Sequence, residues 1–303
     1  MRKFLIKIFA FLGVMVIVYS CTHITFSFLE AKAKGESGRL LYIHNQLKAD
    51  YLIMGSSRAE HHYNPSILTP YYNIGEDRMG IIFNTGRLEL IKRKSKIRSI
   101  LYDVEPDYDL LQDDNSTYLG ALRPYYWHTG IKQIFADVDA TEKYKMLMPF
   151  YAYNSRLLKL LADMKAPDQT KQKGYVPYEG CQEVIREDLP QDKHDKLKYT
   201  YLRRLINYCK QSGIELIFAA SPQLSYESDS VFTPLKRICL QERIPFLNHF
   251  CDKQYTSHRE LFHNANHLNS QGANLYSAEI AAEIKSYRQN KKHPQNYGIK
   301  AKP

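Results

Sequence analysis

Short, mostly apolar runs that alternate with helix-like segments are the feature that most constrains the fold of this chain. Such runs lie at 51–54, 97–104, 214–220 and 244–247, and a shorter one at 71–75 ends in a glycine. Apolar residues recur at helical spacing in 79–94, 199–211, 231–241 and 271–288. Strands that alternate with helices form mainly parallel sheets with helices on both faces. We therefore expect an α/β fold of three layers around a parallel sheet of about five strands.

The same pattern divides the chain into parts. Residues 1–30 form a hydrophobic N-terminal segment, and residues 31–288 are predicted to form the α/β domain. The alternation is lost between about 107 and 198, where tyrosine is frequent, so this stretch is predicted to be a helical or irregular insertion. The last part, 289–303, is rich in lysine and is predicted to be a disordered basic tail.

The N-terminal segment has the length and composition of a membrane span. Arg2, Lys3 and Lys7 precede the stretch 8–29, which carries no charge when its histidine is neutral. About 20 apolar residues cross a bilayer, and basic residues before them favour a cytoplasmic N-terminus. We expect a single-pass anchor with the main domain outside the cytoplasm, in the periplasm or at the cell surface. A cleaved signal peptide and a bacterial lipoprotein modified at Cys21 are the alternatives.

The net charge of +10 and the cysteines argue against several classes of function. The basic residues are scattered or gathered at the C-terminal end, so anionic lipid or an envelope polymer is a more natural partner than nucleic acid. The four cysteines after the N-terminal segment show no C-x-x-C pair and no metal-ligand spacing, and we expect no metal and no cofactor. Cys209 and Cys239 lie in helix-like apolar patterns that predict buried free thiols.

Two polar loops carry residues suited to nucleophilic chemistry. Gly55-Ser56-Ser57-Arg58 directly follows the first strand, and His267 lies in a polar loop before the last helix. A serine hydroxyl becomes a nucleophile when a base takes its proton, so a serine site needs the two loops to meet. The carboxyl ends of parallel strands lie on one rim, which Ser57, Gly75 and Asp103 should share. The serine loop has neither Walker spacing nor a G-x-G-x-x-G pattern, which disfavours a phosphate-binding loop.

Three motifs resemble the SGNH (GDSL-like) hydrolase superfamily. They are Gly55-Ser56-Ser57 after the first strand, Asn73-x-Gly75 after the second, and His267-Leu268-Asn269-x-x-Gly272-Ala273 before the last helix. The similarity covers about residues 49–104 and 214–288. It is closest to the membrane-anchored branch that includes the D-alanyl transfer protein of teichoic acid synthesis and the alginate O-acetylation proteins. The resemblance implies a flavodoxin-like sheet and ester chemistry.

The resemblance also implies roles for single residues. Ser57 would be the nucleophile and His267 its base. The backbone N–H groups of Ser57 and Gly75, together with Asn73, would bind the developing oxyanion. Each well-placed donor of this kind is worth about 3–4 kcal/mol. In this reading Gly75 is glycine because a side chain would obstruct the substrate.

Two positions depart from the family pattern. Asn264 stands where the family has an aspartate, and the nearest match to the family's asparagine after the third strand is Asp103. An amide does not stabilise an imidazolium as a carboxylate does. Unless a backbone carbonyl, Asp103 or Asp252 orients His267, the sequence predicts a slow, specialised or inactive site.

Three more side chains are expected to border the site. Arg58 and Arg78 are candidates for holding an anionic substrate group through paired N–H donors, with salt bridges as the alternative. His61 is a candidate for lining the pocket, with simple exposure as the alternative.

These features predict a serine esterase or O-acyltransferase. It would act on an envelope polysaccharide, polymer or lipid through an acyl-serine intermediate, beside a polytopic membrane acyltransferase as a candidate partner. The alternative is a catalytically inactive scaffold or glycan-binding protein that keeps the fold, and Asn264 is its main support.

Overall fold

A computed structural model describes residues 1–148, 150–154, 156–169, 173–182 and 193–292. The chain divides into two compact units by its internal contacts. One unit comprises residues 1–48, 82–96 and 114–171, and the other comprises 49–81, 97–113 and 172–303. The sheet and all the predicted site residues belong to the second unit.

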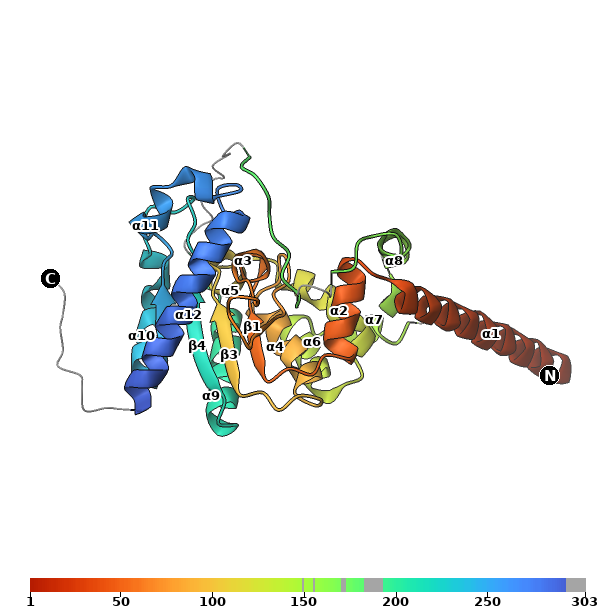
Figure 1. Ribbon diagram of the computed structural model, residues 1–303. Coiled ribbons are helices and arrows are strands. Elements are labelled where there is room, and N and C mark those ends of the chain that lie inside the picture. The colour runs from red at the N-terminus through yellow and green to blue at the C-terminus, as the bar shows by residue number, and fades with distance from the viewer. Residues whose placement is uncertain (149, 155, 170–172, 183–192, 293–303) are drawn as a thin grey trace. The chain divides into compact units, whose positions relative to one another are not determined.

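The second unit is built on a five-stranded sheet in which every neighbouring pair of strands is parallel. The strands follow the order β2-β1-β3-β4-β5, and Figure 1 shows β1, β3 and β4 side by side. This confirms the predicted α/β class, and the order is that of flavodoxin-like sheets, in which the direction of winding reverses between β1 and β3. The strands are β1 (Tyr51–Met54), β2 (Tyr72–Asn73), β3 (Ser99–Asp103), β4 (Glu215–Ala220) and β5 (Phe246–Asn248).

Helices surround this sheet. Ile53, Leu101 and Ile217 belong to one buried cluster with Ala59 of α3 and Tyr276 of α12, which shows what covers that face. Strand side chains alternate between faces, so Leu52, Ile100 and Phe218, all buried, point the other way. Helix α9 contacts β4. The helices of this unit are α3 (Ser57–His62), α5 (Pro106–Asp109), α9 (Lys196–Gln211), η3 (Ser230–Phe232), α10 (Thr233–Glu242), α11 (Lys253–Thr256), η4 (Arg259–Leu261) and α12 (Ser270–Lys292).

The first unit is helical. The part of the chain predicted as an insertion supplies residues 114–171 of it, as short α-helices and 3₁₀ helices. Its elements are α1 (Arg2–Lys32), α2 (Glu36–Asn45), α4 (Ile81–Ile91), η1 (Asn115–Tyr125), α6 (Thr129–Val138), α7 (Glu142–Lys145), η2 (Tyr151–Tyr153) and α8 (Leu157–Asp163).

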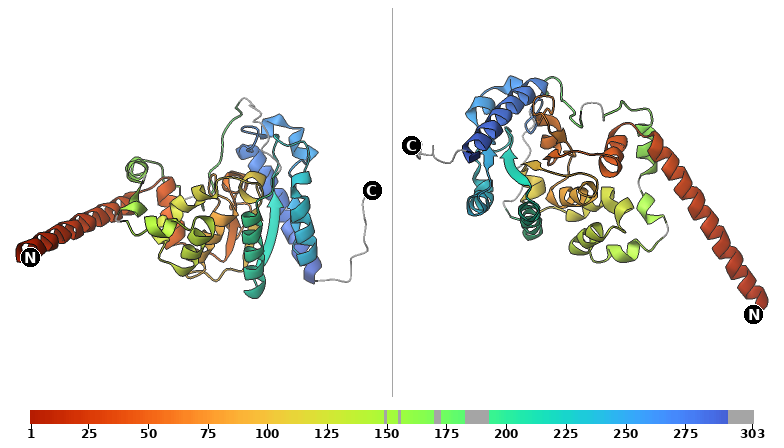
Figure 2. Two further views of the ribbon diagram at one scale, coloured as in Figure 1. Left: turned by 180° about the vertical axis from the view of Figure 1, so that it is seen from behind. Right: turned by 60° about the horizontal axis from the view of Figure 1, so that its bottom comes forward.

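Helix α1 is one continuous helix of 31 residues, visible in both views of Figure 2. It is the one described helix long and apolar enough to cross a membrane, a test that a signal sequence would also pass. Most of its side chains before Phe26, the first buried one, are exposed.

Two smaller predictions concern the cysteines and the C-terminal end. All five cysteines are free thiols, and Cys209 and Cys239 are buried as expected. Helix α12 continues to Lys292, and residues 293–303 of the predicted basic tail lie outside the described part of the chain.

Candidate active site

Ser57 is placed by the turn between β1 and α3. Gly55 has a φ of 144°, and a Cβ there would lie 2.6 Å from the carbonyl oxygen of Asp103, so only glycine fits this position. Ser56 caps α3, and its hydroxyl bonds the Glu105 carboxyl group. The sharp turn therefore puts Ser57 at the first position of α3, at the carboxyl end of β1.

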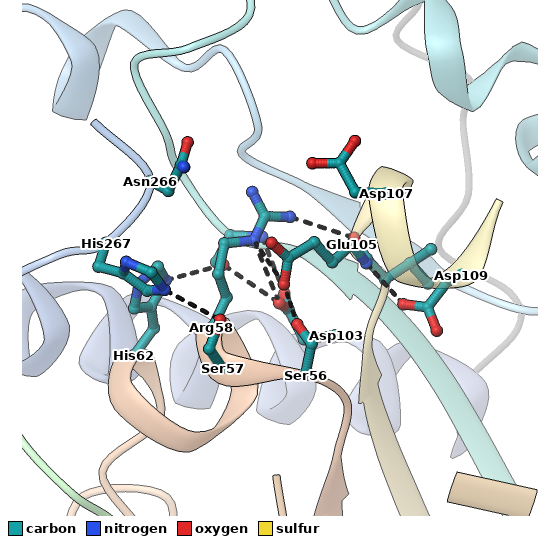
Figure 3. Close-up of polar contacts among 12 residues, drawn as sticks. Ser56, Ser57, Arg58, His62, Asp103, Glu105, Asp107, Asp109, Asn266 and His267 are labelled. Carbon is teal, nitrogen blue, oxygen red and sulfur yellow. Dashed lines mark hydrogen bonds and ion pairs between the residues drawn. The ribbon is translucent and has the colours of Figure 1, made fainter. Parts of the chain in front are cut away.

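His267 meets Ser57 from the loop before α12, as Figure 3 shows. The Nε2 atom of His267 lies 2.9 Å from the Ser57 hydroxyl oxygen, although 210 residues separate them in the sequence. On the other side of the ring, Nδ1 lies 3.0 Å from Oδ1 of Asn264. The structure thus joins the three predicted residues in one hydrogen-bonded chain.

The amide of Asn264 is oriented by the backbone of its own loop. Its Oδ1 also accepts the backbone N–H groups of Asn266 and His267, each at 2.9 Å. These donors identify the atom facing His267 as the oxygen. Nδ1 of His267 must then carry the proton, and Nε2 is left to accept the proton of Ser57. In Ser-His-Asp proteases, an asparagine in place of the aspartate costs about 10⁴ in turnover through the wrong tautomer. Asn264 selects the productive tautomer.

The charge environment of His267 makes it a weak base. Burial lowers the pKa of His267 to about 3, and the positive fields of His61, Arg58 and His263 act in the same direction. The partner of Nδ1 is the neutral amide of Asn264, which does not oppose these positive fields as a carboxylate would. Asp103 and Asp252, the two carboxylates that the sequence offered for orienting the ring, bond other groups instead.

Arg58 is a buried cation beside Ser57. One Nη donates to the carbonyl of Val104 at 3.2 Å, and Nε lies 3.8 Å from Asp103 and 3.9 Å from Glu105. Burial alone would lower the pKa of Arg58, but the two carboxyl groups raise it above its ordinary value. Arg58 is therefore held by internal ion pairs, the alternative that the sequence left open.

Glu105 belongs to a group of buried acids at the end of β3. Burial raises its pKa to about 8 despite the nearby Arg58, and burial raises the pKa of Asp109 to about 7. Asp109 accepts the hydroxyl of Tyr102 and the backbone N–H of Glu105, both at 2.7 Å. The acid next to the Ser57 turn therefore changes charge near neutral pH.

A second hydrogen-bonded chain supports the loop that carries His267. Nε2 of His62 accepts the backbone N–H of Leu268 at 3.0 Å. Nδ1 of His62 then donates to the Ser221 hydroxyl at 2.9 Å, which donates to Asp103 at 3.3 Å. Burial holds the pKa of His62 well below its usual range, so the ring stays neutral. Asp103 thus acts on the site through Ser221 and His62, and it does not touch His267.

Two of the predicted oxyanion donors, Asn73 and the N–H of Gly75, form hydrogen bonds within the protein. The N–H of Gly75 donates to Oδ1 of Asn73 at 2.9 Å, and Nδ2 of Asn73 donates to the carbonyls of Ala59 and Tyr63. A Cβ on Gly75 would lie 2.4 Å from the backbone nitrogen of Glu60. The glycine therefore allows the loop after β2 to pack on α3, a packing role that the sequence did not predict. By contrast, no described residue accepts the N–H of Ser57.

His61 and Arg78 differ in their surroundings. His61 is buried, and its ring stacks on Tyr178 with 3.9 Å between the centroids and meets His267 edge-on at 5.7 Å. Tyr178 also stacks on His263. His61 therefore lines the site, whereas Arg78 is exposed beside Asp77. Tyr178 comes from a stretch without periodicity, where the sequence gives no signal for it.

A polar cavity of about 750 Å³ adjoins the His267 loop. Its wall is bonded to that loop, since Ser225 donates to Oδ1 of Asn266 and Leu224 donates to the carbonyl of Ala265. Two buried polar atoms, Nε2 of Gln223 and Oγ1 of Thr256, have no hydrogen-bond partner among the described residues. The other polar or charged lining residues are Tyr226, Glu227, Lys253 and Arg259.

Comparisons with known proteins add little to this geometry. No family model matches the chain. No curated protein matches it either. Among solved structures, it is similar to a Bacteroides fragilis protein described provisionally as an acylhydrolase, with 11% identity and a TM-score of 0.44. That alignment covers 84% of this chain and 97% of the other. The fold assignment rests on the strand order and register given above.

Proposed function

We propose that this chain is a serine esterase or O-acyltransferase of the SGNH type. The observation that carries the proposal is the chain of hydrogen bonds from Ser57 through His267 to Asn264. It lies at the carboxyl ends of the strands where the winding of the sheet reverses, which is the usual ligand site of such sheets.

The geometry supports a two-step reaction through an acyl-serine. The Ser57 oxygen attacks the ester carbonyl carbon while its proton moves to Nε2 of His267. The ester C–O bond breaks, and the leaving alcohol takes that proton. Water or a sugar hydroxyl then attacks the acyl group, gives its proton to His267, and Ser57 recovers it as the acyl group leaves. Hydrolysis and transfer differ only in the nucleophile of the second step.

Two groups are placed to stabilise the negative charge of the intermediate. The N–H of Ser57 has no acceptor among the described residues and stands at the start of α3. The Arg58 guanidinium lies next to Ser57, on the side away from His267, in Figure 3. The Arg58 charge is shared with Asp103 and Glu105, so we propose that Arg58 acts mainly as a fixed, buried donor group. In this proposal, Ser57 and Arg58 take the role that the resemblance implied for Gly75 and Asn73.

The substrate that fits best is an oxygen-rich envelope component. The polar cavity beside the His267 loop is lined by Tyr226, Glu227, Lys253 and Arg259, whose hydroxyl and charged groups suit sugar or ester oxygens. We propose a polysaccharide, polymer or lipid of the cell envelope as the acyl acceptor or ester. A polytopic membrane acyltransferase is the candidate supplier of the acyl group.

The proposed location follows from α1. We propose that α1 crosses the cytoplasmic membrane with Arg2, Lys3 and Lys7 on the inner side, so that the chain after α1 lies outside. Lipidation at Cys21 is the alternative form of attachment, and cleavage of a signal peptide is a further alternative.

A second candidate function is that of an inactive envelope scaffold or glycan-binding protein. Its support is the neutral Asn264 at the acid position and the low pKa of His267. The fold and the polar cavity would then serve binding alone.

Turnover of a chromogenic acetate ester by the full chain in mild detergent separates these functions. The proposed enzyme loses activity in Ser57→Ala and in His267→Ala, by about 10³-fold or more. His258→Ala, which removes an exposed histidine paired with Glu260, is the matched control and should keep full activity. A wild-type rate equal to that of Ser57→Ala would favour the scaffold.

A further inference from the structure

An apolar groove in the first unit is built partly by α1 itself. Its cavity volume is about 310 Å³, and Tyr19 of α1 forms part of its wall. The Tyr19 ring lies 5.8 Å from that of Phe150. The groove is therefore continuous with the apolar surface of α1. Its other large lining residues include Trp127, Leu147, Met148 and Tyr153.

The side chains around this groove are unusually exposed for their chemistry. Trp127 is 68% exposed, Leu147 69% and Met148 65%. On α8, which packs Leu160 against Phe26 and Leu29 of α1, Leu158 is 80% exposed. Large apolar side chains gathered in this way mark a site of contact with lipid or protein.

The level of the groove along α1 favours lipid. A hydrocarbon core of about 30 Å takes about 20 helical residues at a rise of about 1.5 Å. The uncharged stretch begins at Ile8, but the Lys7 side chain can extend its ammonium group back to the inner surface, so we place the start of the hydrocarbon at Phe4. A length of about 20 residues from Phe4 ends near His23. Tyr19 then lies about 6 Å inside the far boundary of the hydrocarbon. The groove residues that contact Tyr19 share this level.

The polarity of the contacts changes at the same level. His23 bonds the hydroxyl of Tyr153 at 2.6 Å, one turn beyond Tyr19. Glu30, two turns further, bonds Arg156, and Glu36 bonds Lys159. The contacts therefore pass from apolar, through aromatic and hydroxyl groups, to ion pairs. This is the order of a membrane interface, where Trp and Tyr are enriched.

We propose that this groove and its exposed neighbours form a membrane-contact surface, filled by the acyl-chain ends nearest the headgroups in the leaflet away from the N-terminus. The first unit then contacts the bilayer through this surface as well as through α1. The proposal rests on the proposed crossing of the membrane by α1 and is independent of the ester chemistry.

Trp127, the single tryptophan of the chain, reports directly on this surface. The full chain is reconstituted into phosphatidylcholine vesicles whose acyl chains are brominated either near the glycerol or near the methyl end. The proposal predicts that Trp127 fluorescence is quenched at least about twofold more by bromine near the glycerol, and only weakly by aqueous iodide. Strong iodide quenching without bromolipid quenching would overturn it. Quenching by neither would also overturn it, because a protein would then cover the surface.

Two charged substitutions and a flotation assay make the test specific. Leu147→Glu should lower the bromolipid quenching and raise the iodide quenching, whereas Leu240→Glu, at an 82% exposed leucine of α10, should change neither. Vesicles are floated after alkaline carbonate to check that α1 is inserted. A chain that floats without bromolipid quenching refutes the contact surface alone, and a chain that does not float refutes the span as well. Ester turnover in the same vesicles reports separately on the site chemistry.

Discussion

The amide of Asn264 controls two properties of His267, the proposed base for Ser57: its tautomer and its basicity. It holds His267 in the productive tautomer but adds no negative charge beside the imidazolium that forms during the reaction. With a His267 pKa of about 3, the ring is neutral and ready to accept a proton at any pH above about 4. The same low pKa makes the His267 ring a weak base, which limits the proton transfer from Ser57.

Asn264→Asp should therefore increase ester turnover at pH 7, by about tenfold, since a carboxylate raises the pKa of His267 and stabilises the imidazolium. The active form is the neutral ring, so activity falls as pH drops through this pKa. The acid limb of the pH–rate profile should lie near pH 3 in the wild type and move toward neutral pH in the variant. Asn274→Asp, an equivalent change on α12 away from His267, should alter neither. An unchanged acid limb in Asn264→Asp would contradict this account of the base.

His62 is predicted to act as a positioning residue. His62→Leu removes the acceptor of the Leu268 N–H and should lower kcat by about 10²-fold, because misplaced catalytic groups cost that much. His62→Gln keeps an acceptor and a donor and should recover most of the loss. Equal losses in both variants, or a shift of the acid limb, would show that His62 does more than hold the loop.

Sequence reasoning located the three residues of the Ser57 chain but not their supports. Ser57 and His267 stand out as candidates because they lie in polar loops next to strand and helix ends, whereas Asn264 was placed by the resemblance to the SGNH motif. Ser221 and Glu105 act through contacts that only the folded chain creates, and Gly75 matters for packing that no motif encodes. Those contacts join strands that are far apart in sequence.

At the scale of elements, the contact between β2 and α3 holds the nucleophile. Gly75→Ala places a Cβ 2.4 Å from the backbone nitrogen of Glu60, which cannot move without shifting α3. We expect a loss of about 2–3 kcal/mol in the free energy of unfolding, together with loss of turnover. Chemical denaturation measures the first effect. Gly120→Ala, where nothing lies within 4 Å of the new Cβ, should cost under about 1 kcal/mol, and a similar cost in both variants would count against the packing argument.

His249 joins the end of β5 to α12. Burial alone would lower its pKa, but hydrogen bonds to Glu283 and Asp252 raise it to about 9. A raised histidine pKa stabilises the fold fully below pH 6.5 and loses that contribution as pH rises through 9. Because both acids are partly exposed, we expect His249→Gln to cost about 2 kcal/mol at pH 6 and little above pH 10.

The pH dependence of unfolding in the full chain checks this expectation. His258→Gln removes an exposed histidine that pairs with Glu260, and it should have almost no effect at either pH. A His249→Gln defect that persists unchanged at pH 10 would mean that the ring contributes packing rather than charge.

The elements themselves were largely predictable. Each of the five strands lies inside a run seen in the sequence or extends one residue beyond it, because strands of a parallel sheet covered on both faces are mostly apolar. The 3₁₀ helices η1 and η2 were not predicted individually, because η1 has about 3.0 residues per turn rather than the 3.6 of an α-helix and η2 has only three residues. Division of the chain into two units depends on tertiary contacts and likewise has no local signal.

At the scale of the whole molecule, we propose that α1 and the apolar groove attach the chain to a membrane and that Ser57, on the rim of the sheet, reacts with an ester. Fold class followed from the alternation of elements, whereas activity depends on geometry at one serine. The central claim is accordingly about the reactivity of that serine.

A fluorophosphonate probe tests that claim most directly, with the modified residue identified by mass spectrometry of the full chain in mild detergent. We predict one adduct, on Ser57, that disappears in Ser57→Ala, falls strongly in His267→Ala and persists in Ser228→Ala, an exposed serine outside the site. Wild-type labelling no higher than that of Ser57→Ala, or an adduct on another serine, would contradict it.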